Sequence, residues 1–189
     1  MAVVRRNILG PGAANTQARD RYVQGVKLLK QEFLGPTTQD LGVPGQAVQV
    51  STYDLFVAWH HVAMFRFTPP SQGDRNSAHR GPVFLPWHRH MLILLEYQLQ
   101  RVLGDDDFGL PYWDWAADGD LTRPQQLASP IWGAQWMGGT GNPVTTGPFA
   151  FNAGDPQTWQ VRLVSNSNGQ LVSVNRGLRR GLAMPPPVG

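Results

Sequence analysis

The chain has 189 residues and a mass of 20.9 kDa, which suits one domain of ordinary size, or most of a larger one, with a hydrophobic core. Hydrophobic residues make up 41% of the sequence and charged residues 15%, which excludes a disordered chain and a coiled coil. The net charge of +3 includes no long basic run and no apolar stretch could span a membrane, so neither nucleic acid nor a membrane is an expected partner.

Three amphipathic helices are predicted in the first part of the chain from apolar residues at helical spacing. They cover residues 16–33, the segment from Ser51 or Thr52 to before Pro69, and the segment from after Pro86 to about Leu103. Ser51 or Thr52 suits the start of the second helix, because a hydroxyl there accepts from free backbone N–H groups. Residues 116–189 are expected to be rich in loops, with a short hairpin over 160–174 that turns at Asn168-Gly169.

All five histidines fall between positions 60 and 90. His60 and His88 each lie on the apolar stripe of a predicted helix, and His79 lies in the loop between them. Neutral imidazoles that converge from two helices and a loop form a trigonal metal site with an open face, which suits copper or zinc. His61 and His90 point about 100° and 200° away around their helices, so we expect them on outer faces.

Two other readings of these histidines follow from the sequence. A single histidine on an apolar face is more often a hydrogen-bonded core residue than a ligand. Three imidazoles also suit a hydrolytic zinc site, in which the metal activates water. However, there is no His-Glu-x-x-His element, and the seven tryptophans favour an apolar pocket over a polar hydrolase cleft. Cysteine is absent, which excludes thiolate ligands and disulfides.

Several segments resemble the tyrosinases. Residues 79–89 (HRGPVFLPWHR), with the segment that continues to Glu96, resemble the first copper-binding region of that family. Residues 110–115 (LPYWDW) resemble the end of the same region. Residues 53–60 (YDLFVAWH) resemble the element that supplies the first ligand. The similarity covers residues 16–115 well and continues more weakly through 147–149 and 175–180, which resemble the linker region of bacterial, actinomycete-type enzymes.

The resemblance implies a mainly α fold, a helical bundle around a type 3 copper site with long irregular loops and minor β structure. The positions that match the ligands of the first copper are His60, His79 and His88. Phe84 matches the aromatic residue that packs against those imidazoles. Arg89, Glu96 and Asp114 match positions that we interpret as buried ion-pair structure. Without cysteine, the thioether link of some fungal, plant and molluscan relatives is impossible, which agrees with a bacterial type.

The chain departs from the family pattern because no histidine follows position 90, so the ligands of the second copper are missing. We therefore expect residues 1–189 to be the N-terminal part of a tyrosinase-like copper domain, with the first copper site in 53–103 and a loop-rich region in 116–189. One copper is expected per chain and two in the complete site. Two explanations are open. The second site would lie on another chain or fragment of a tyrosinase divided near Gly189, or the chain would be a truncated relative with one copper. The loop-like end at Pro185-Pro186-Pro187 favours the first explanation.

The expected function is copper-dependent oxidation of phenols, o-diphenols or o-aminophenols to quinones or quinone imines with O2. The alternatives are an oxygen carrier and a non-catalytic copper-binding fragment. Expected partners are the second chain or fragment, a small phenolic substrate with O2 and, by resemblance, a copper-delivering chaperone. No signal-peptide core is present at the N-terminus, so we expect a cytoplasmic protein or one secreted without its own signal peptide.

Overall fold

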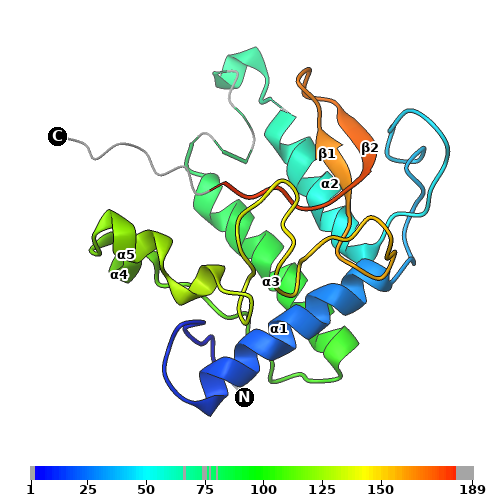
Figure 1. Cartoon of the computed structure of the whole chain (residues 1–189). Helices are drawn as coiled ribbons and strands as arrows, with labels where there is room; N and C mark the ends of the chain where they lie inside the picture. Colours follow the sequence, from blue (N-terminus) through cyan, green and yellow to red (C-terminus); the bar gives the residue numbers. More distant parts are fainter. Residues whose placement is uncertain (1–2, 66, 74–75, 77, 80, 182–189) are drawn as a thin grey trace. The chain divides into compact units, whose positions relative to one another are not determined.

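The computed structural model describes residues 3–65, 67–73, 76, 78–79 and 81–181 (Figure 1). The described residues are mainly helical, with five α-helices, two short 3-10 helices and one two-stranded sheet, which confirms the predicted fold class. The chain divides into two compact units. The first unit contains residues up to 5, 20–110 and 162–174, and the second contains 6–19, 111–161 and 175 onward. The predicted proline-rich end at 185–187 lies outside the described residues.

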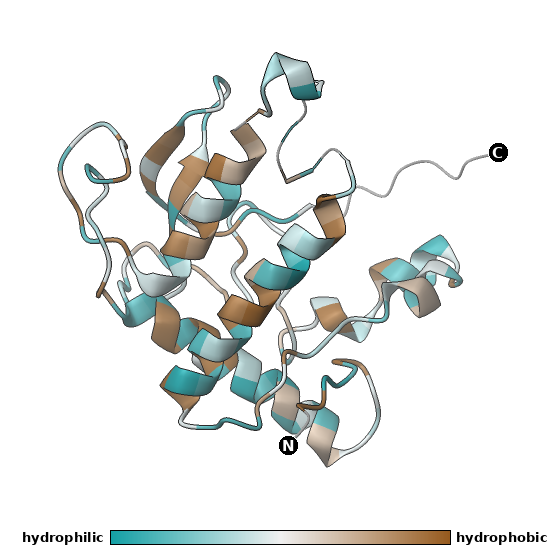
Figure 2. Ribbon diagram, turned by 180° about the vertical axis from the view of Figure 1, so that it is seen from behind, coloured by the Kyte–Doolittle hydropathy of each residue, from teal (hydrophilic) through white to brown (hydrophobic). Residues whose placement is uncertain are grey.

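Three long helices occur close to their predicted positions: α1 (Ala13–Gln31), α2 (Thr52–Phe65) and α3 (Phe84–Leu103). Helix α3 begins at Phe84, two residues before Pro86 and earlier than predicted. Pro86 is tolerated in the first turn because the N–H that proline lacks would have no intrahelical partner there. It ends at Gly104, whose φ of 60° is left-handed. Apolar and polar residues alternate along α3, as expected of an amphipathic helix (Figure 2). None of the helices in the described part of the chain is long and apolar enough to cross a bilayer.

A buried polar network fixes the start of α2 in the first unit. The Ser51 hydroxyl accepts from the Asp54 N–H at 3.1 Å and donates to the Asp54 carboxylate at 2.7 Å, so the predicted cap is formed by Ser51. The same carboxylate accepts from the ammonium of Lys30 on α1, and both side chains are buried. Arg162 lies 3.8 Å from Asp54 and donates to the Lys30 carbonyl at 3.0 Å. Burial lowers the pKa of Lys30, and the charge of Asp54 opposes this shift.

The predicted hairpin is formed by β1 (Val161–Ser165) and β2 (Leu171–Arg176). Leu163 and Leu171 pack with Ala58 of α2 in the core of the first unit, together with Val43 and Val50. Figure 1 shows the hairpin beside α2. The core of the first unit therefore holds the middle of α2 against the hairpin.

The hairpin turn lies against the last turn of α2. Gly169 adopts a φ of 73°, which glycine tolerates without the steric cost that other residues meet. A Cβ at this position would lie 2.5 Å from the ring of Phe65, the last residue of α2. The predicted turn at Asn168-Gly169 is thus required both by backbone conformation and by close approach.

The second unit contains two short helices that the sequence did not predict, α4 (Trp115–Gly119) and α5 (Arg123–Leu127). Each has five residues, too few to show a helical period in the sequence. Local capping stabilises both, because Asp114 accepts from the Ala117 N–H and Thr122 forms a capping box with Gln125. A single turn of 3-10 helix at Pro130–Trp132 follows.

Glu32, which directly follows α1, forms an ion pair with Arg101 in the last turn of α3. This pair makes the stability of the fold depend on pH. The Glu32 carboxylate accepts from Arg101 at 2.8 and 2.5 Å and from the Thr52 hydroxyl at 2.6 Å. The hydrogen bond from Arg101 is the main reason that the pKa of Glu32 lies below its usual value. A lowered carboxyl pKa stabilises the folded state above the unfolded-state pKa, and this contribution is lost as the pH falls through the folded-state pKa.

We therefore expect Glu32→Gln to lower the free energy of unfolding at pH 7 by at most about 1 kcal/mol, because the pair is partly exposed. The difference from the unaltered chain should be smaller in acid, below the lowered pKa that Glu32 has in the folded state, than at pH 7. Urea unfolding of the variant and of the unaltered chain at both pH values measures this difference in the free energy of unfolding. A difference that is equal at both would contradict the prediction.

Candidate metal centre

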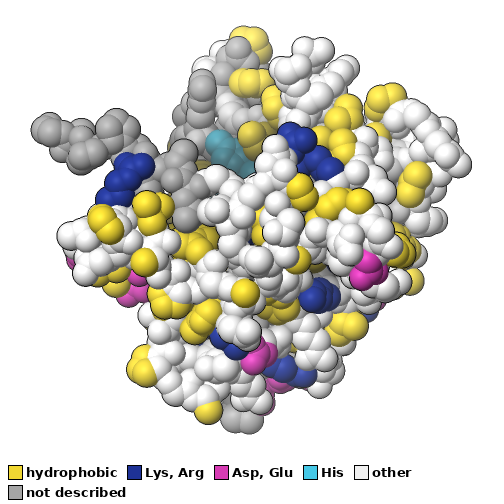
Figure 3. Space-filling view, viewed as in Figure 1, with side chains coloured by type: hydrophobic (Ala, Val, Ile, Leu, Met, Phe, Trp, Pro, Cys, Tyr) yellow, Lys and Arg dark blue, Asp and Glu magenta, His cyan; other side chains and the backbone are white. Residues whose placement is uncertain are grey.

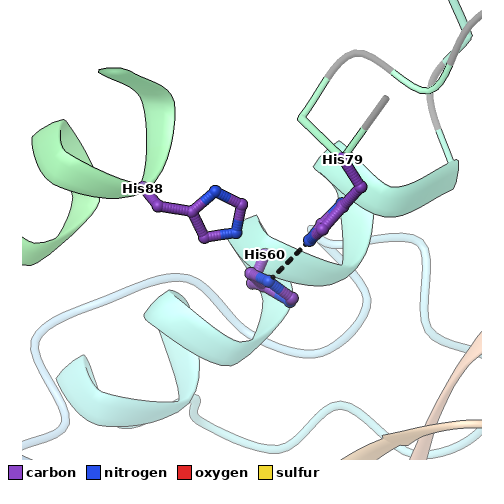
Figure 4. A group of neighbouring side chains, drawn as sticks. All are labelled: His60, His79 and His88. Carbon is purple, nitrogen blue, oxygen red and sulfur yellow. Dashed lines mark hydrogen bonds between the residues drawn. The ribbon is translucent and has the colours of Figure 1, made fainter. Parts of the chain in front are cut away.

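Three histidines converge in the first unit from two helices and the loop between them. His60 comes from α2, His88 from α3, and His79 from the segment before α3 (Figure 4). One ring nitrogen of each lies within 4.8 Å of the others, and the Nε2 atoms of His60 and His79 are 3.1 Å apart. A metal–imidazole bond is about 2.0–2.1 Å long, so a modest ring rotation would bring all three nitrogens to one ion. The sequence-predicted trio is therefore one cluster.

Hydrogen bonds determine which nitrogen two of these rings offer. The Nδ1 of His88 lies 2.8 Å from the Phe84 carbonyl oxygen, one turn earlier in α3. A carbonyl only accepts, so His88 carries its hydrogen on Nδ1 and leaves the lone pair of Nε2 free. The Nδ1 of His79 lies 3.2 Å from the amide oxygen of Asn76. Metal-binding histidines are commonly oriented by such a hydrogen bond from the other ring nitrogen.

The electrostatics of the cluster favour neutral imidazole at His60. Burial is the main cause that lowers the pKa of His60, and the nearby His79, His88 and His61 lower it further. Neutral imidazole is the form that binds metals. The donor set consists of imidazoles alone, which suits copper among the metals that prefer nitrogen ligands.

Aromatic rings surround the cluster on one side. The ring of Trp87 lies 4.8 Å from that of His88 and 5.8 Å from that of His60, measured between ring centroids. Phe84 lies 4.4 Å from His88 and 6.2 Å from His79. The three histidines are half-buried, and Figure 3 shows histidine surface reaching the exterior of the molecule. The cluster thus has an apolar wall and an open side.

The other two histidines lie outside the cluster. His61 is half-buried and lies beside Phe65, with ring centroids 4.8 Å apart and ring planes tilted by 41°. His90 is exposed and meets the ring of Trp59 edge-on at 6.2 Å. Neither belongs to the group of described residues that could share a metal ion.

The three residues interpreted as buried ion-pair structure differ from one another. Glu96 is buried, and its carboxylate accepts from Arg5 at 3.0 Å and from the Leu110 N–H at 2.7 Å. Arg89 is exposed. It lies two turns before Glu96, in the N-terminal part of α3, where most of the neighbouring residues are also exposed. Asp114 is also exposed, and its carboxylate caps α4. The interpretation of buried ion pairs thus describes Glu96 and needs correction for the other two.

Asn76 contacts a ligand of the proposed site and is not among the residues predicted from the sequence. Its amide oxygen accepts from the N–H groups of Ala78 at 3.0 Å and His79 at 2.9 Å. This is the local pattern by which asparagine hydrogen-bonds backbone two and three residues ahead. An asparagine three residues before a histidine in a loop was the available signal.

Comparison with known proteins places these features in a family. The profile described as the common central domain of tyrosinase matches residues 50–181. The tyrosinase of Streptomyces antibioticus is 41% identical over 115 residues, which cover 59% of this chain and 37% of that protein. The tyrosinase of Felis catus is 31% identical over 173 residues, covering 84% of this chain and 30% of that protein. The 5,6-dihydroxyindole-2-carboxylic acid oxidase of Bos taurus is 33% identical over 132 residues, covering 60% and 23%.

The helical fold and the converging imidazoles define a class of protein, the helical metalloproteins whose metal ligands are imidazoles. The profile match covers more than half of the chain and includes all three histidines of the cluster. This chain belongs to the tyrosinase family. It spans less than two fifths of the length of the relatives described above. The predicted resemblance, including the similarity to actinomycete enzymes, is therefore confirmed.

Proposed function

We propose that this chain supplies the first copper site of a two-copper oxidase that converts phenols, o-diphenols or o-aminophenols to quinones or quinone imines with O2. The observation that carries the proposal is the convergence of three imidazoles within 4.8 Å, with no other ligand type among them. Family membership supports copper as the metal. The second copper site would lie on another chain or fragment.

Within this proposal, His60, His79 and His88 hold one copper ion. Copper at this site, together with the second copper, supplies the redox chemistry with O2. The chain's own contribution is to orient two of the imidazoles, through the Phe84 carbonyl for His88 and the Asn76 amide for His79. Trp87 and Phe84 place aromatic rings beside the ligands. A small phenol would approach from the open side and stack on aromatic rings.

The need for a second part follows from the ligand count. All five histidines lie at positions 60–90, and the three that converge form one site, so no second set of three remains. An apolar groove of about 530 Å³ between α2 and α3 supports a complementary surface, with Phe56, Trp59, Val62 and Leu94 in its lining. Apolar surface of this kind is typical of protein contact sites.

Only part of the apolar stripe of α3 is available as a contact surface. Leu92, Leu95 and Leu99 lie at helical spacing and form this stripe. Leu92 is 46% exposed, but Leu99 is fully buried. It faces α1, where a Cβ on Gly25 would lie 2.7 Å from the Leu99 side chain. The available surface therefore lies on Leu92 and the groove, and Leu99 belongs to the core of the first unit.

The proposal is tested by native purification followed by copper and activity measurements. We expect one copper per chain and a co-migrating fragment that contains a His-x-x-x-His element. The copper-loaded chain alone should show no catechol-dependent O2 uptake, and adding the fragment should restore it. Reversible O2 binding without catechol oxidation would instead identify an oxygen carrier. A stable monomeric chain that oxidises catechol by itself would overturn the two-part proposal.

A further inference from the structure

Asn76 makes four contacts that join the loop before α3 to both sides of the metal centre. Its amide oxygen accepts from two backbone N–H groups, those of Ala78 and His79, at 3.0 and 2.9 Å. The same oxygen lies 3.2 Å from the Nδ1 of His79. Its amide nitrogen donates to the carbonyl of Met64 in the last turn of α2. No other described side chain makes a hydrogen bond to the ring nitrogen of His79 that faces away from the cluster.

These contacts fix the orientation of the Asn76 amide. Backbone N–H groups only donate, so the amide atom that faces the two of them is the oxygen. The NH2 group is then directed at the Met64 carbonyl, which only accepts. Both ends of the amide agree with this orientation, and a flipped amide would lose all of these hydrogen bonds.

The amide orientation in turn fixes the proton of His79. Because the Asn76 oxygen has no hydrogen to give, the Nδ1 of His79 is the donor, and its Nε2 keeps a lone pair. That Nε2 is the atom that lies 3.1 Å from the Nε2 of His60 (Figure 4). The oxygen of Asn76 therefore performs for a loop histidine what the Phe84 carbonyl performs for His88 within a helix.

We propose that Asn76 is a positioning residue of the metal centre: its oxygen holds the proton of His79 on Nδ1, and its NH2 group anchors the ligand loop to the end of the helix that bears His60. This inference rests on the proposed function in that His79 is taken to bind copper. A helical histidine is oriented by its own helix. A loop histidine lacks that support, and the side chain of Asn76 supplies it.

The proton position is tested first, without any metal. In the metal-free chain, nitrogen NMR of the imidazoles should show His79 with its proton on Nδ1. In Asn76→Ala the proton should distribute over both ring nitrogens, whereas Asn76→Asp, which keeps an acceptor oxygen, should retain Nδ1–H. A proton on Nε2 of His79 in the unaltered chain would overturn the proposal, even if Asn76→Ala failed to fold.

Copper affinity is tested second, by competition for copper(I) with a chromophoric chelator. Loss of a residue that orients a metal ligand typically lowers metal affinity about 10- to 100-fold, which is the loss expected for Asn76→Ala. Asn76→Asp should lose less. If the unaltered chain bound no copper, the proposed function would fail while the NMR result still decided the role of Asn76.

Asn166 provides the matched control. Its amide oxygen also accepts from two backbone N–H groups, those of Asn168 and Gln170, both at 2.9 Å, but in the hairpin turn. Asn166→Ala removes the same kind of local support with no histidine attached, so copper affinity and the His79 proton should stay unchanged. An equal loss of affinity in both alanine variants would show that general loosening of the fold is responsible, and would overturn the assignment to Asn76.

Discussion

Replacing His88 with alanine is expected to abolish stoichiometric copper binding. The variant removes one of three imidazoles, and the remaining pair of His60 and His79 lacks the third ligand of a trigonal site. The deleted ring is half-exposed, so the loss of packing should be small and α3 should persist. Copper per chain after dialysis, measured by atomic absorption, gives the result, and circular dichroism checks the fold.

His90 is the matched control because it lies two residues later on the same helix. It is exposed and outside the cluster, so His90→Ala should retain about one copper per chain. The two variants remove the same side chain from the same helix and differ only in the direction of that side chain. Equal copper loss in both would contradict the ligand assignment.

The second large effect is expected in the buried ion pair of Lys30 and Asp54. Asp54→Ala leaves the ammonium of Lys30 buried without its carboxylate and also removes an acceptor of the Ser51 hydroxyl. Removing one partner of a buried ion pair typically costs about 3–5 kcal/mol of the free energy of unfolding. Urea denaturation followed by circular dichroism measures the loss, provided that the transition is two-state.

Two control variants test whether the loss of stability comes from leaving a buried charge without its partner. Replacing both partners with apolar residues, Lys30→Met with Asp54→Leu, should recover part of the stability, because the ammonium is removed together with its carboxylate. The Ser51 hydroxyl and Arg162 still lose the Asp54 carboxylate in this variant. Asp105→Ala breaks a partly exposed pair with Arg21, whose atoms are 3.0 Å apart, and should cost less than about 1 kcal/mol. Similar losses in Asp54→Ala and Asp105→Ala would contradict the prediction.

Much of the first unit could be predicted from the sequence because its signals are repeated many times. The helices α1, α2 and α3 each span several turns, so their apolar spacing is unambiguous, and the cap at Ser51 and the stop at Gly104 have specific chemical causes. The hairpin turn was predictable from Asn168-Gly169 for the same reason. The converging histidines followed from two helical faces and one loop.

The remaining features depend on contacts that a sequence does not reveal. Helices α4 and α5 are too short to show a period, so the loop prediction for that region missed them. Leu99 occupies the same stripe as Leu92, yet only the position of α1 determines that Leu99 is covered. Arg89 and Asp114 match family positions by identity, but burial depends on neighbours in space. The role of Asn76 depends on the orientation of one amide.

The close contact between Gly169 and Phe65 has a practical consequence for labelling. Hairpin tips are usually the preferred positions for inserted tags, but here added atoms would press on the last turn of the helix that bears His60. Gly119 is a better position, since a Cβ there would meet no atom within 4 Å. Because the chain has no cysteine, Gly119→Cys would give one thiol for a fluorescent dye or a spin label. Such a probe could report on this protein in mixtures while leaving the ligand-bearing helices untouched.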